Sequence, residues 1–340
     1  GLALAHPVPI TAVVTDSRKV QPGCIFVCFP GERVDGHDYA AKAYQAGAEY
    51  VIANHPVEGV PEDHLVICES SYLAMIRMAS NYRTLFSPLM IGVTGSVGKT
   101  TTKEFCYAVL SAFGNTLKTE GNQNNEIGLP NTLFRLEGPP QYAGAGMSHL
   151  GEIARLVRAA RPSAGIITMI GVSHLENLGS RENILKAKME ICQGLPDGAP
   201  LVLNADDDLL PTAQIPGRLR PVWFGIRSSS ADVRAINIHT VGEGTGFTLV
   251  DHQIDGFTMV FYIQPIADIR SVSINRQFLS FQNILDNKRN QFFREMVWTI
   301  IVGAASNADW HFVGIGISLH KHICACLGCT VWTVRVKRCC

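Results

Sequence analysis

The chain has 340 residues with a hydrophobic share of 46%, which is enough for about two domains with sizeable cores and excludes a disordered chain. Lys and Arg number 29 and Asp and Glu number 29, so the zero net charge gives no overall attraction to nucleic acid or to an anionic membrane. The longest apolar run near the C-terminus, residues 296–305, is about half of the ~20 residues that a membrane-spanning helix needs, and the chain begins at Gly1 without a charged and apolar leader. We therefore expect a fragment or a processed chain.

The first 86 residues alternate short apolar runs with turn residues, a pattern typical of strands and helices in succession. Four β-rich runs predict strands over residues 11–15, 25–29, 50–53 and 65–68. Apolar residues at helical spacing predict helices over 38–46 and 71–85. We expect these elements to form a small N-terminal α/β domain.

A second alternation begins after Pro88. A buried strand over 89–94 leads through a glycine loop into a helix over 99–113. Further helices are predicted over 152–161 and 180–192, and further strands over 165–170 and 201–204. This order implies βαβ units, so the expected fold class is α/β with a P-loop-type central domain and a mainly parallel sheet.

The glycine loop carries the strongest motif of the sequence, since it follows a strand and opens a helix. Glycines let backbone N–H groups turn toward phosphate oxygens, and the helix N-terminus adds about half a positive charge. A lysine at the helix start can reach the β- and γ-phosphates of a nucleotide, and the threonine beside it can bind Mg²⁺. The predicted ATP-binding residues here are Thr94, Gly95, Ser96, Val97, Gly98, Lys99, Thr100 and Thr101. The alternative is a glycine-rich turn before an ordinary helix.

This loop, with the sequence TGSVGKTT, resembles the phosphate loop of the Mur ligases, the ATP-dependent amide-forming enzymes of peptidoglycan synthesis. The segment TEGNQNNEIGLP at 119–130, the segment DSRKV at 16–20 and the segment GERVDGHD at 31–38 also resemble that family. The resemblance covers about residues 10–250. It implies a UDP-substrate-binding domain over 1–86, whose start is missing, and an ATP-binding domain over 87–250.

The resemblance implies amide synthesis through an acyl phosphate, with ATP and Mg²⁺ as cofactors. The asparagine-rich segment is similar to that of members that join D-alanyl-D-alanine to UDP-MurNAc-tripeptide. No nucleic acid or membrane span is expected among the partners, and we expect a cytoplasmic monomer. Two alternatives stay open: a non-catalytic remnant that binds nucleotide or UDP-substrate, and a sister Mur ligase that adds the third peptide residue.

Residue roles follow from the resemblance where motifs match. Lys99 and Thr100 would hold the phosphates and Mg²⁺ as catalytic and metal-binding residues. Lys188 falls at the lysine that is carbamylated in the family, and His174 matches the metal-site histidine. Asn204 and Asp206 resemble the segment on the adenine side. Without the resemblance, a solvated helix lysine, a satisfied loop histidine and an acidic turn would be the simpler interpretations.

The predicted substrate contacts are weaker. Asn122, Asn124 and Asn125 are expected to face the sugar-peptide substrate, although asparagine-rich loops are often only turns. Ser17 and Arg18 are candidates for the uridine nucleotide site, and a surface turn is nearly as good an interpretation.

Two features depart from the family pattern. Family members end a strand near residue 144 with Glu-x-Gly, whose Glu binds Mg²⁺, whereas this chain has Gly144 and Ala145 there after a strand that looks shortened. Loss of one carboxylate ligand is expected to weaken Mg²⁺ binding and to slow the reaction. This chain is therefore expected to be impaired or inactive.

The second departure is the C-terminal segment, since the resemblance stops at about Val250 and the family's third domain is not recognisable beyond it. Residues 251–340 hold three of the four Trp and half of the Cys but only one Pro. The segment reads as a frameshifted, antisense or fused translation. The alternatives are a metal site formed by His320, His322, Cys324, Cys326 and Cys329, whose spacing is not a standard zinc pattern, or a domain of unknown role.

Overall fold

The structure, a computed structural model, describes residues 8–31, 34–111, 115–120, 124–138, 142–146, 152–173, 175–241, 244–251, 258–266, 269–275, 315–324 and 329–338. The chain divides into two compact units. The N-terminal unit consists of Gly1–Phe86 and Glu126–Leu136, and the central unit consists of Ser87–Asn125 and Glu137–Cys340. Within the described part of the chain, no helix has the length and apolar character needed to cross a membrane. The domain limits near residues 86 and 250 stay a prediction.

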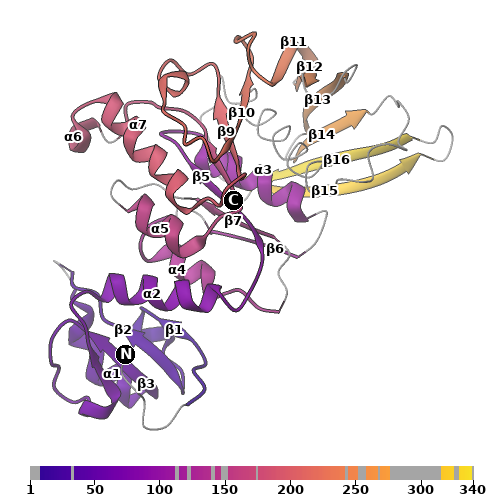
Figure 1. Cartoon of the computed structure of the whole chain (residues 1–340). Helices are drawn as coiled ribbons and strands as arrows, with labels where there is room; N and C mark the ends of the chain where they lie inside the picture. Colours follow the sequence, from indigo (N-terminus) through magenta and orange to yellow (C-terminus); the bar gives the residue numbers. More distant parts are fainter. Residues whose placement is uncertain are drawn as a thin grey trace. The chain divides into compact units, whose positions relative to one another are not determined.

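The N-terminal unit is built on a parallel sheet in the order β1 (Val13–Val14), β2 (Cys24–Val27), β3 (Ala48–Ala53) and β4 (Leu65–Ile67). Two α-helices, α1 (Ala40–Gln45) and α2 (Ser71–Arg83), accompany the sheet in this unit (Figure 1). Short 3₁₀ turns lie at Ser17–Lys19, Gly36–Tyr39 and Glu62–His64. The parallel strands confirm the α/β class expected for this region.

A histidine fixes the ends of two of these strands. The Nε2 atom of His37 accepts a hydrogen bond from the backbone N–H of Asn54, at 3.0 Å, so this ring nitrogen carries a lone pair. The Nδ1 atom then carries the proton and donates to Oδ1 of Asp35 at 2.5 Å. The ring therefore joins the turn after β2 to the end of β3, where it also stacks on His55 at 4.4 Å between centroids.

A later segment of the chain completes this unit. Helix α4 (Gly128–Leu133) packs against α2, and the hydroxyl of Tyr82 donates to the carbonyl of Leu136 at 2.8 Å. The rings of Tyr82 and Phe134 lie 5.9 Å apart. The sequence pattern did not predict this helix, because its six residues are too few to display a helical period.

The central unit contains a longer sheet. Among the described residues its order is β15-β16-β14-β13-β12-β11-β10-β9-β8-β5-β7-β6. Pairing is parallel from β6 to β11 and antiparallel from β11 to β15, so the mainly parallel sheet is confirmed for the half that holds β5 to β11. The parallel strands are β5 (Leu89–Thr94), β6 (Thr116–Lys118), β7 (Tyr142–Gly146), β8 (Ala164–Ile167), β9 (Pro200–Asn204), β10 (Arg220–Gly225) and β11 (Val233–Val241).

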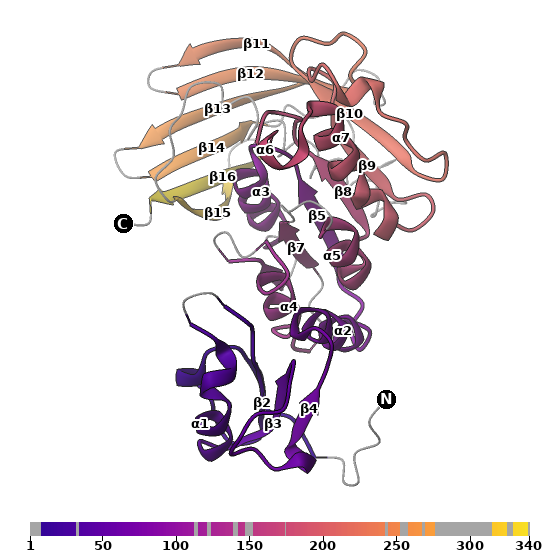
Figure 2. The same cartoon turned by 90° about the vertical axis from the view of Figure 1, so that its left-hand side faces the viewer.

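Helices cover both sides of the parallel strands, as connections between parallel strands require. Helix α3 (Lys99–Ser111) lies on one side of β5, and α5 (Ile153–Ala160) lies on the other (Figures 1 and 2). Helices α6 (Leu175–Leu178) and α7 (Arg181–Met189) follow β8. The predicted helix over 180–192 ends its α-helical part at Met189 and continues as a 3₁₀ turn over Glu190–Gly194, and a second such turn spans Leu210–Thr212.

The antiparallel strands are β12 (Gly244–Asp251), β13 (Thr258–Ile266), β14 (Ile269–Asn275), β15 (Ile315–Cys324) and β16 (Cys329–Arg338). In the register of β15 and β16, Cys324 lies opposite Cys329. No group of three or more metal-binding side chains occurs within the described residues, and Cys326 of the suggested metal site lies outside them.

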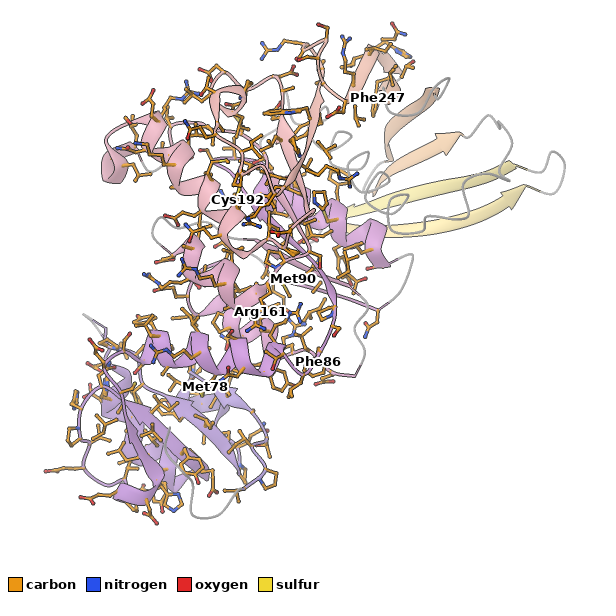
Figure 3. The ribbon with its side chains drawn as sticks, viewed as in Figure 1. Met78, Phe86, Met90, Arg161, Cys192 and Phe247 are labelled. Carbon is orange, nitrogen blue, oxygen red and sulfur yellow. The ribbon has the colours of Figure 1, made fainter. Side chains whose placement is uncertain are left out.

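The central unit contains buried apolar side chains, among them Met90 of β5, Cys192 after α7 and Phe247 of β12 (Figure 3). Four of the five cysteines before residue 250 are buried, and all five are free thiols. Burial raises the pKa of Cys28 and of Cys106 to about 12, so these thiols stay protonated and act as small apolar side chains.

Candidate nucleotide site

The predicted phosphate loop connects the end of β5 to the start of α3, in the strand–loop–helix order that the sequence predicts. Gly95 has a φ of 142° and Gly98 a φ of 85°, conformations that side-chain-bearing residues rarely adopt. Thr94, Gly95 and Ser96 are buried, whereas Val97 and Thr100 are exposed. The loop therefore presents its outer residues to solvent and rests its inner residues on the protein.

Thr168, directly after β8, supports this loop through hydrogen bonds. Its hydroxyl lies 2.5 Å from the carbonyl oxygen of Val97 and 3.3 Å from that of Thr94. A Cβ atom on Gly95 would come within 2.0 Å of the same hydroxyl oxygen. The backbone N–H of Ser96 donates to the carbonyl of Met169 at 2.9 Å. Only a glycine fits between the loop and this support.

The side chain of Lys99 folds back over the loop. Its Nζ atom donates to the carbonyl of Gly95 at 2.6 Å and to that of Ser96 at 3.1 Å, and burial lowers its pKa. The buried hydroxyls of Thr94 and Ser96 have no hydrogen-bond partner within the part of the chain that the structure describes. An ammonium group, two such hydroxyls and a glycine cradle are the groups that a nucleotide's phosphates require, so the residues fit that ligand.

A second lysine approaches this cation. Lys188, on α7, is only 2% exposed. Its pKa falls from 10.5 to about 8, first because of burial and then because of the charge of Lys99, with Glu190 acting in the opposite direction. The effect of Lys99 on Lys188 indicates that the two amines lie near each other, and two neighbouring cations favour an anionic ligand. His174, the third predicted catalytic residue, lies outside the described residues.

The predicted metal site fits less well than the phosphate site. Strand β7 pairs with five residues of β5, and its third residue is Gly144, where the family pattern has a carboxylate. No atom of the described residues lies within 4 Å of the position that a Cβ on Gly144 would take. Thr100 supplies a hydroxyl, but no cluster of carboxylates and histidines that could hold a metal occurs among the described residues. Among the described residues, the donor set is therefore incomplete for a hard cation.

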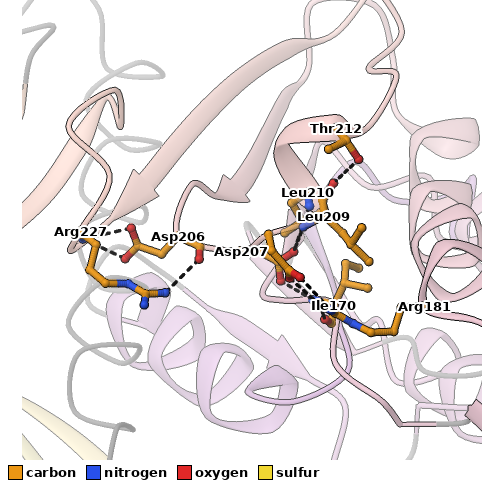
Figure 4. Close-up of polar contacts among 9 residues, drawn as sticks. Ile170, Arg181, Asp206, Asp207, Leu209, Leu210, Thr212 and Arg227 are labelled. Atoms are coloured by element: carbon orange, nitrogen blue, oxygen red, sulfur yellow. Dashed lines mark hydrogen bonds and ion pairs between the residues drawn. The ribbon is translucent and has the colours of Figure 1, made fainter.

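Three consecutive aspartates follow β9, and each has a separate set of partners (Figure 4). The carboxylate of Asp206 accepts the backbone N–H groups of Ile226, Arg227 and Ser228 at 2.6–3.1 Å. Burial acts to raise the pKa of Asp206, but these amide bonds outweigh it and leave the pKa below its ordinary value. The side-chain oxygen of Asn204 accepts from the N–H of Asp206 at 2.9 Å. The adenine-side role of both residues stays a prediction.

The predicted substrate residues lie in both units. Ser17 and Arg18 form a turn of the N-terminal unit, where Arg18 pairs with both carboxylate oxygens of Asp16 at 2.9 and 2.8 Å. The hydrogen bonds from Arg18 lower the pKa of Asp16 to about 2. Asn124 and Asn125 end the first part of the central unit, and Asn122 lies outside the described residues. Their contacts with substrate stay predictions.

Sequence reasoning overlooked two residues around the loop. Thr168 is one, and Lys103 is the other: it is 2% exposed and donates to the carbonyl of Thr119 at 2.6 Å. Lys103 lies one helical turn after Lys99, a spacing that places both side chains on one face of α3. That spacing was available in the sequence, whereas nothing local distinguishes Thr168.

Two family comparisons match this arrangement. Residues 93–264 match the Mur ligase middle domain, and residues 9–77 match the catalytic domain of the Mur ligase family. The chain belongs to the Mur ligase family. The first match extends past Val250, where the sequence resemblance was expected to stop.

Individual Mur ligases are also similar to this chain. The UDP-N-acetylmuramoyl-tripeptide–D-alanyl-D-alanine ligase of Escherichia coli (strain K12) is 40% identical over 247 residues, which are 71% of this chain and 54% of that protein. The corresponding ligase of Bacillus subtilis (strain 168) is 38% identical over 266 residues, 77% of this chain and 56% of that protein. The crystal structure of the MurF ligase from Thermotoga maritima in complex with ADP superposes with a TM-score of 0.67 at 32% identity, covering 73% of this chain and 57% of that one. This Mur ligase chain thus spans about half the length of the curated relatives it matches.

Proposed function

We propose that this chain is the UDP-substrate-binding and ATP-binding part of a ligase that joins D-alanyl-D-alanine to UDP-MurNAc-tripeptide. The observation that carries the proposal is the phosphate loop, in which Lys99 and two buried hydroxyls without a partner among the described residues line a glycine cradle, with Lys188 near enough to sense the charge of Lys99. The likeness to D-alanyl-D-alanine ligases at 38–40% identity supports the choice of substrates.

The proposed reaction forms one amide bond for each ATP. The terminal carboxylate of the tripeptide attacks the γ-phosphate of ATP, which gives an acyl phosphate and ADP. The amine of D-alanyl-D-alanine then attacks the acyl carbon, and inorganic phosphate leaves. Lys99 would hold the negative charge that gathers on the transferred phosphoryl group.

Lys188 has a further proposed role as a carbamate. Formation of a carbamate requires a neutral amine, and a pKa of about 8 leaves a sizeable neutral fraction near neutral pH. The carbamate would be an anion beside Lys99 and would help to bind Mg²⁺ together with Thr100. Because the carboxylate at Gly144 is absent, we assign no reaction step to the metal.

The direct test is phosphate release from ATP by the full chain. Release that requires both UDP-MurNAc-tripeptide and D-alanyl-D-alanine is expected for the ligase. Replacing the tripeptide by the dipeptide with a free diamino acid tests the sister enzyme that adds the third residue. Lys99→Ala should remove nucleotide binding, and unchanged binding of ADP by this variant would contradict a phosphate site at the loop.

A second candidate is a protein that binds nucleotide and UDP-substrate without turnover. Gly144 favours it, since the end of β7 offers no carboxylate at this position. ADP binding measured by calorimetry, together with no phosphate release under any substrate combination, would support this candidate over the ligase.

A further inference from the structure

Residues 168–173, which support the phosphate loop, are themselves fixed at Ile170 by two side chains. The backbone N–H of Ile170 donates to Oδ2 of Asp207 at 2.7 Å, and its carbonyl accepts from Nη2 of Arg181 at 2.7 Å (Figure 4). Both atoms of this residue that can form backbone hydrogen bonds are thus bound by side chains from other elements. Strand β8 has already ended at Ile167, so no sheet pairing fixes the backbone here.

The two side chains are fixed in turn. Oδ1 of Asp207 accepts the N–H groups of Leu209 and Leu210, both at 2.9 Å, and Asp207 is 8% exposed. Arg181 is the first residue of α7 and forms a two-pronged ion pair with Asp208 at 2.6 and 2.7 Å. The end of β9 and the start of α7 therefore meet at Ile170.

Residues 168–173 and the phosphate loop are in close contact, so neither can move far alone. Besides the bonds of Thr168 and Met169 to the loop, the hydroxyl of Ser173 lies 3.4 Å from the carbonyl oxygen of Ser96. A Cβ on Gly171 would come within 3.2 Å of Cβ of Ser96. Residues 168–173 thus contact the loop before and after Ile170, so a shift of Ile170 must move the loop.

We propose that Asp207 and Arg181 are positioning residues for the nucleotide site, which set the shape of the phosphate loop by holding Ile170. Their hydrogen bonds among the described residues go to Ile170, Asp208, Leu209 and Leu210 and not to the loop, so they act through residues 168–173. This inference rests on the proposed function only for the identity of the ligand. In this proposal, the aspartates after β9 link the end of β9 to the segment that follows β8.

Asp207→Asn is a sharp test because it removes one bond. Its oxygen can still accept from Leu209 and Leu210, but its NH₂ group would face the N–H of Ile170, and two donors cannot pair. We expect ADP binding by the full chain, measured by calorimetry, to weaken about tenfold, while the midpoint of thermal unfolding falls no more than in the matched control below. Binding of UDP, the probe for the N-terminal unit, should not change.

The matched control is Asp232→Asn. Asp232 accepts the backbone N–H of Trp223 at 2.7 Å, a bond of the same kind in the same sheet that does not involve residues 168–173. ADP affinity should stay within about twofold of the original in this variant. Equal losses in Asp207→Asn and Asp232→Asn would overturn the proposal.

Arg181→Gln supplies a second variant. Since both side chains hold one residue, the double variant should bind ADP only slightly more weakly than Asp207→Asn alone. If the two losses multiply in full, the residues act independently and the proposal fails.

Hydrogen exchange without nucleotide separates this inference from the proposed function. Asp207→Asn should speed exchange of the Ser96 amide, whose bond to Met169 depends on the held segment. Unchanged exchange at Ser96 overturns the positioning role, whether or not the chain binds ADP. Faster exchange at Ser96 in a chain that binds no ADP would support the positioning role and contradict the proposed function.

Discussion

The phosphate loop of the central unit and the turn at Asp16–Arg18 of the N-terminal unit are both predicted nucleotide-binding segments, and they are built differently. Buried groups support the loop: Thr168 bonds two of its carbonyls, and Ser96 bonds Met169. The turn supports itself, since Arg18 is paired with its own neighbour Asp16 and its side chain is 88% exposed. The first site is shaped before any ligand arrives, whereas the second must exchange an ion pair for its ligand.

This difference affects how much of the contact energy with the ligand appears as binding affinity. A site fixed by buried contacts loses little conformational entropy on binding. Most of the contact energy with the ligand therefore contributes to affinity. An exposed ion pair contributes little and is screened by salt. We therefore expect substitutions at the loop to change stability and binding together, and substitutions at the turn to change only binding.

The largest effect is expected for Gly95→Ala. The new Cβ would lie 2.0 Å from the hydroxyl oxygen of Thr168, in a backbone conformation with φ of 142°. We expect a loss of about 2–4 kcal/mol in the free energy of unfolding, measured by chemical denaturation, together with loss of ADP binding. Gly179→Ala is the control, because its φ is 73° but no atom of the described residues lies within 4 Å of the new Cβ, and it should cost about 1 kcal/mol. Equal costs would show that the loop has room to yield.

Lys188 should make stability depend on pH. Its pKa is about 8 in the folded chain against an ordinary 10.5, so between these values the unfolded chain binds more protons and stability rises with pH. The full rise should reach on the order of 3 kcal/mol, of which about 2 kcal/mol falls between pH 7.5 and 9.5. Lys188→Met should abolish this rise and stabilise the chain at pH 7.5, as chemical denaturation at pH 7.5 and 9.5 can measure.

The control for this prediction is Lys186→Met, an exposed residue of the same helix, which should leave the pH dependence intact. A strong loss of stability in Lys188→Met at pH 7.5 would mean that favourable contacts of the buried ammonium outweigh its loss of hydration. The contrast in stability between the loop region and the turn would then be weaker.

Gly144→Glu tests whether the incomplete metal site can be completed. No described atom lies within 4 Å of the Cβ position, so the side chain can begin there without a clash, but its buried carboxylate should lower stability when no Mg²⁺ is present. A carboxylate there is expected to increase the effect of Mg²⁺ on ADP affinity several-fold, measured by calorimetry with and without the metal. Gly144→Gln has nearly the same shape without the charge, and an equal effect of both variants would contradict a metal ligand at this position.

The smallest effect is expected for Arg18→Ala. Its side chain is mostly exposed, so the midpoint of thermal unfolding should not change measurably. The pKa of Asp16 should rise from about 2 toward its ordinary 3.8, which NMR titration can follow. A several-fold loss of UDP affinity would support the predicted uridine site, whereas unchanged affinity would leave only a surface turn.

The sequence was most informative where chemistry and local structure coincide. Glycines at 95 and 98 and a lysine at 99, between an apolar run and a helical period, predicted both the elements and their ligand. It was least informative where a residue acts through a distant partner. Thr168, Asp207 and Arg181 look ordinary in their own segments, since their partners lie 11–74 residues away along the chain.

Short elements were the other gap. Strand β6, with three residues, and helix α4, with six, carry no readable period, although α4 is held by its packing on α2. In such elements tertiary contacts rather than local preference stabilise the structure.

The sequence alone determined that this chain has an α/β fold with a phosphate loop and that it resembles the Mur ligases, because these properties lie in local periodicity and in a contiguous motif. Only the tertiary structure decided that Thr168 blocks every residue but glycine at position 95, that Lys188 shares its surroundings with Lys99, and that Asp207 and Arg181 grip one residue from opposite sides. Those properties depend on which strand ends become neighbours, and strand order is set by burial and hydrogen bonding between segments far apart in the chain.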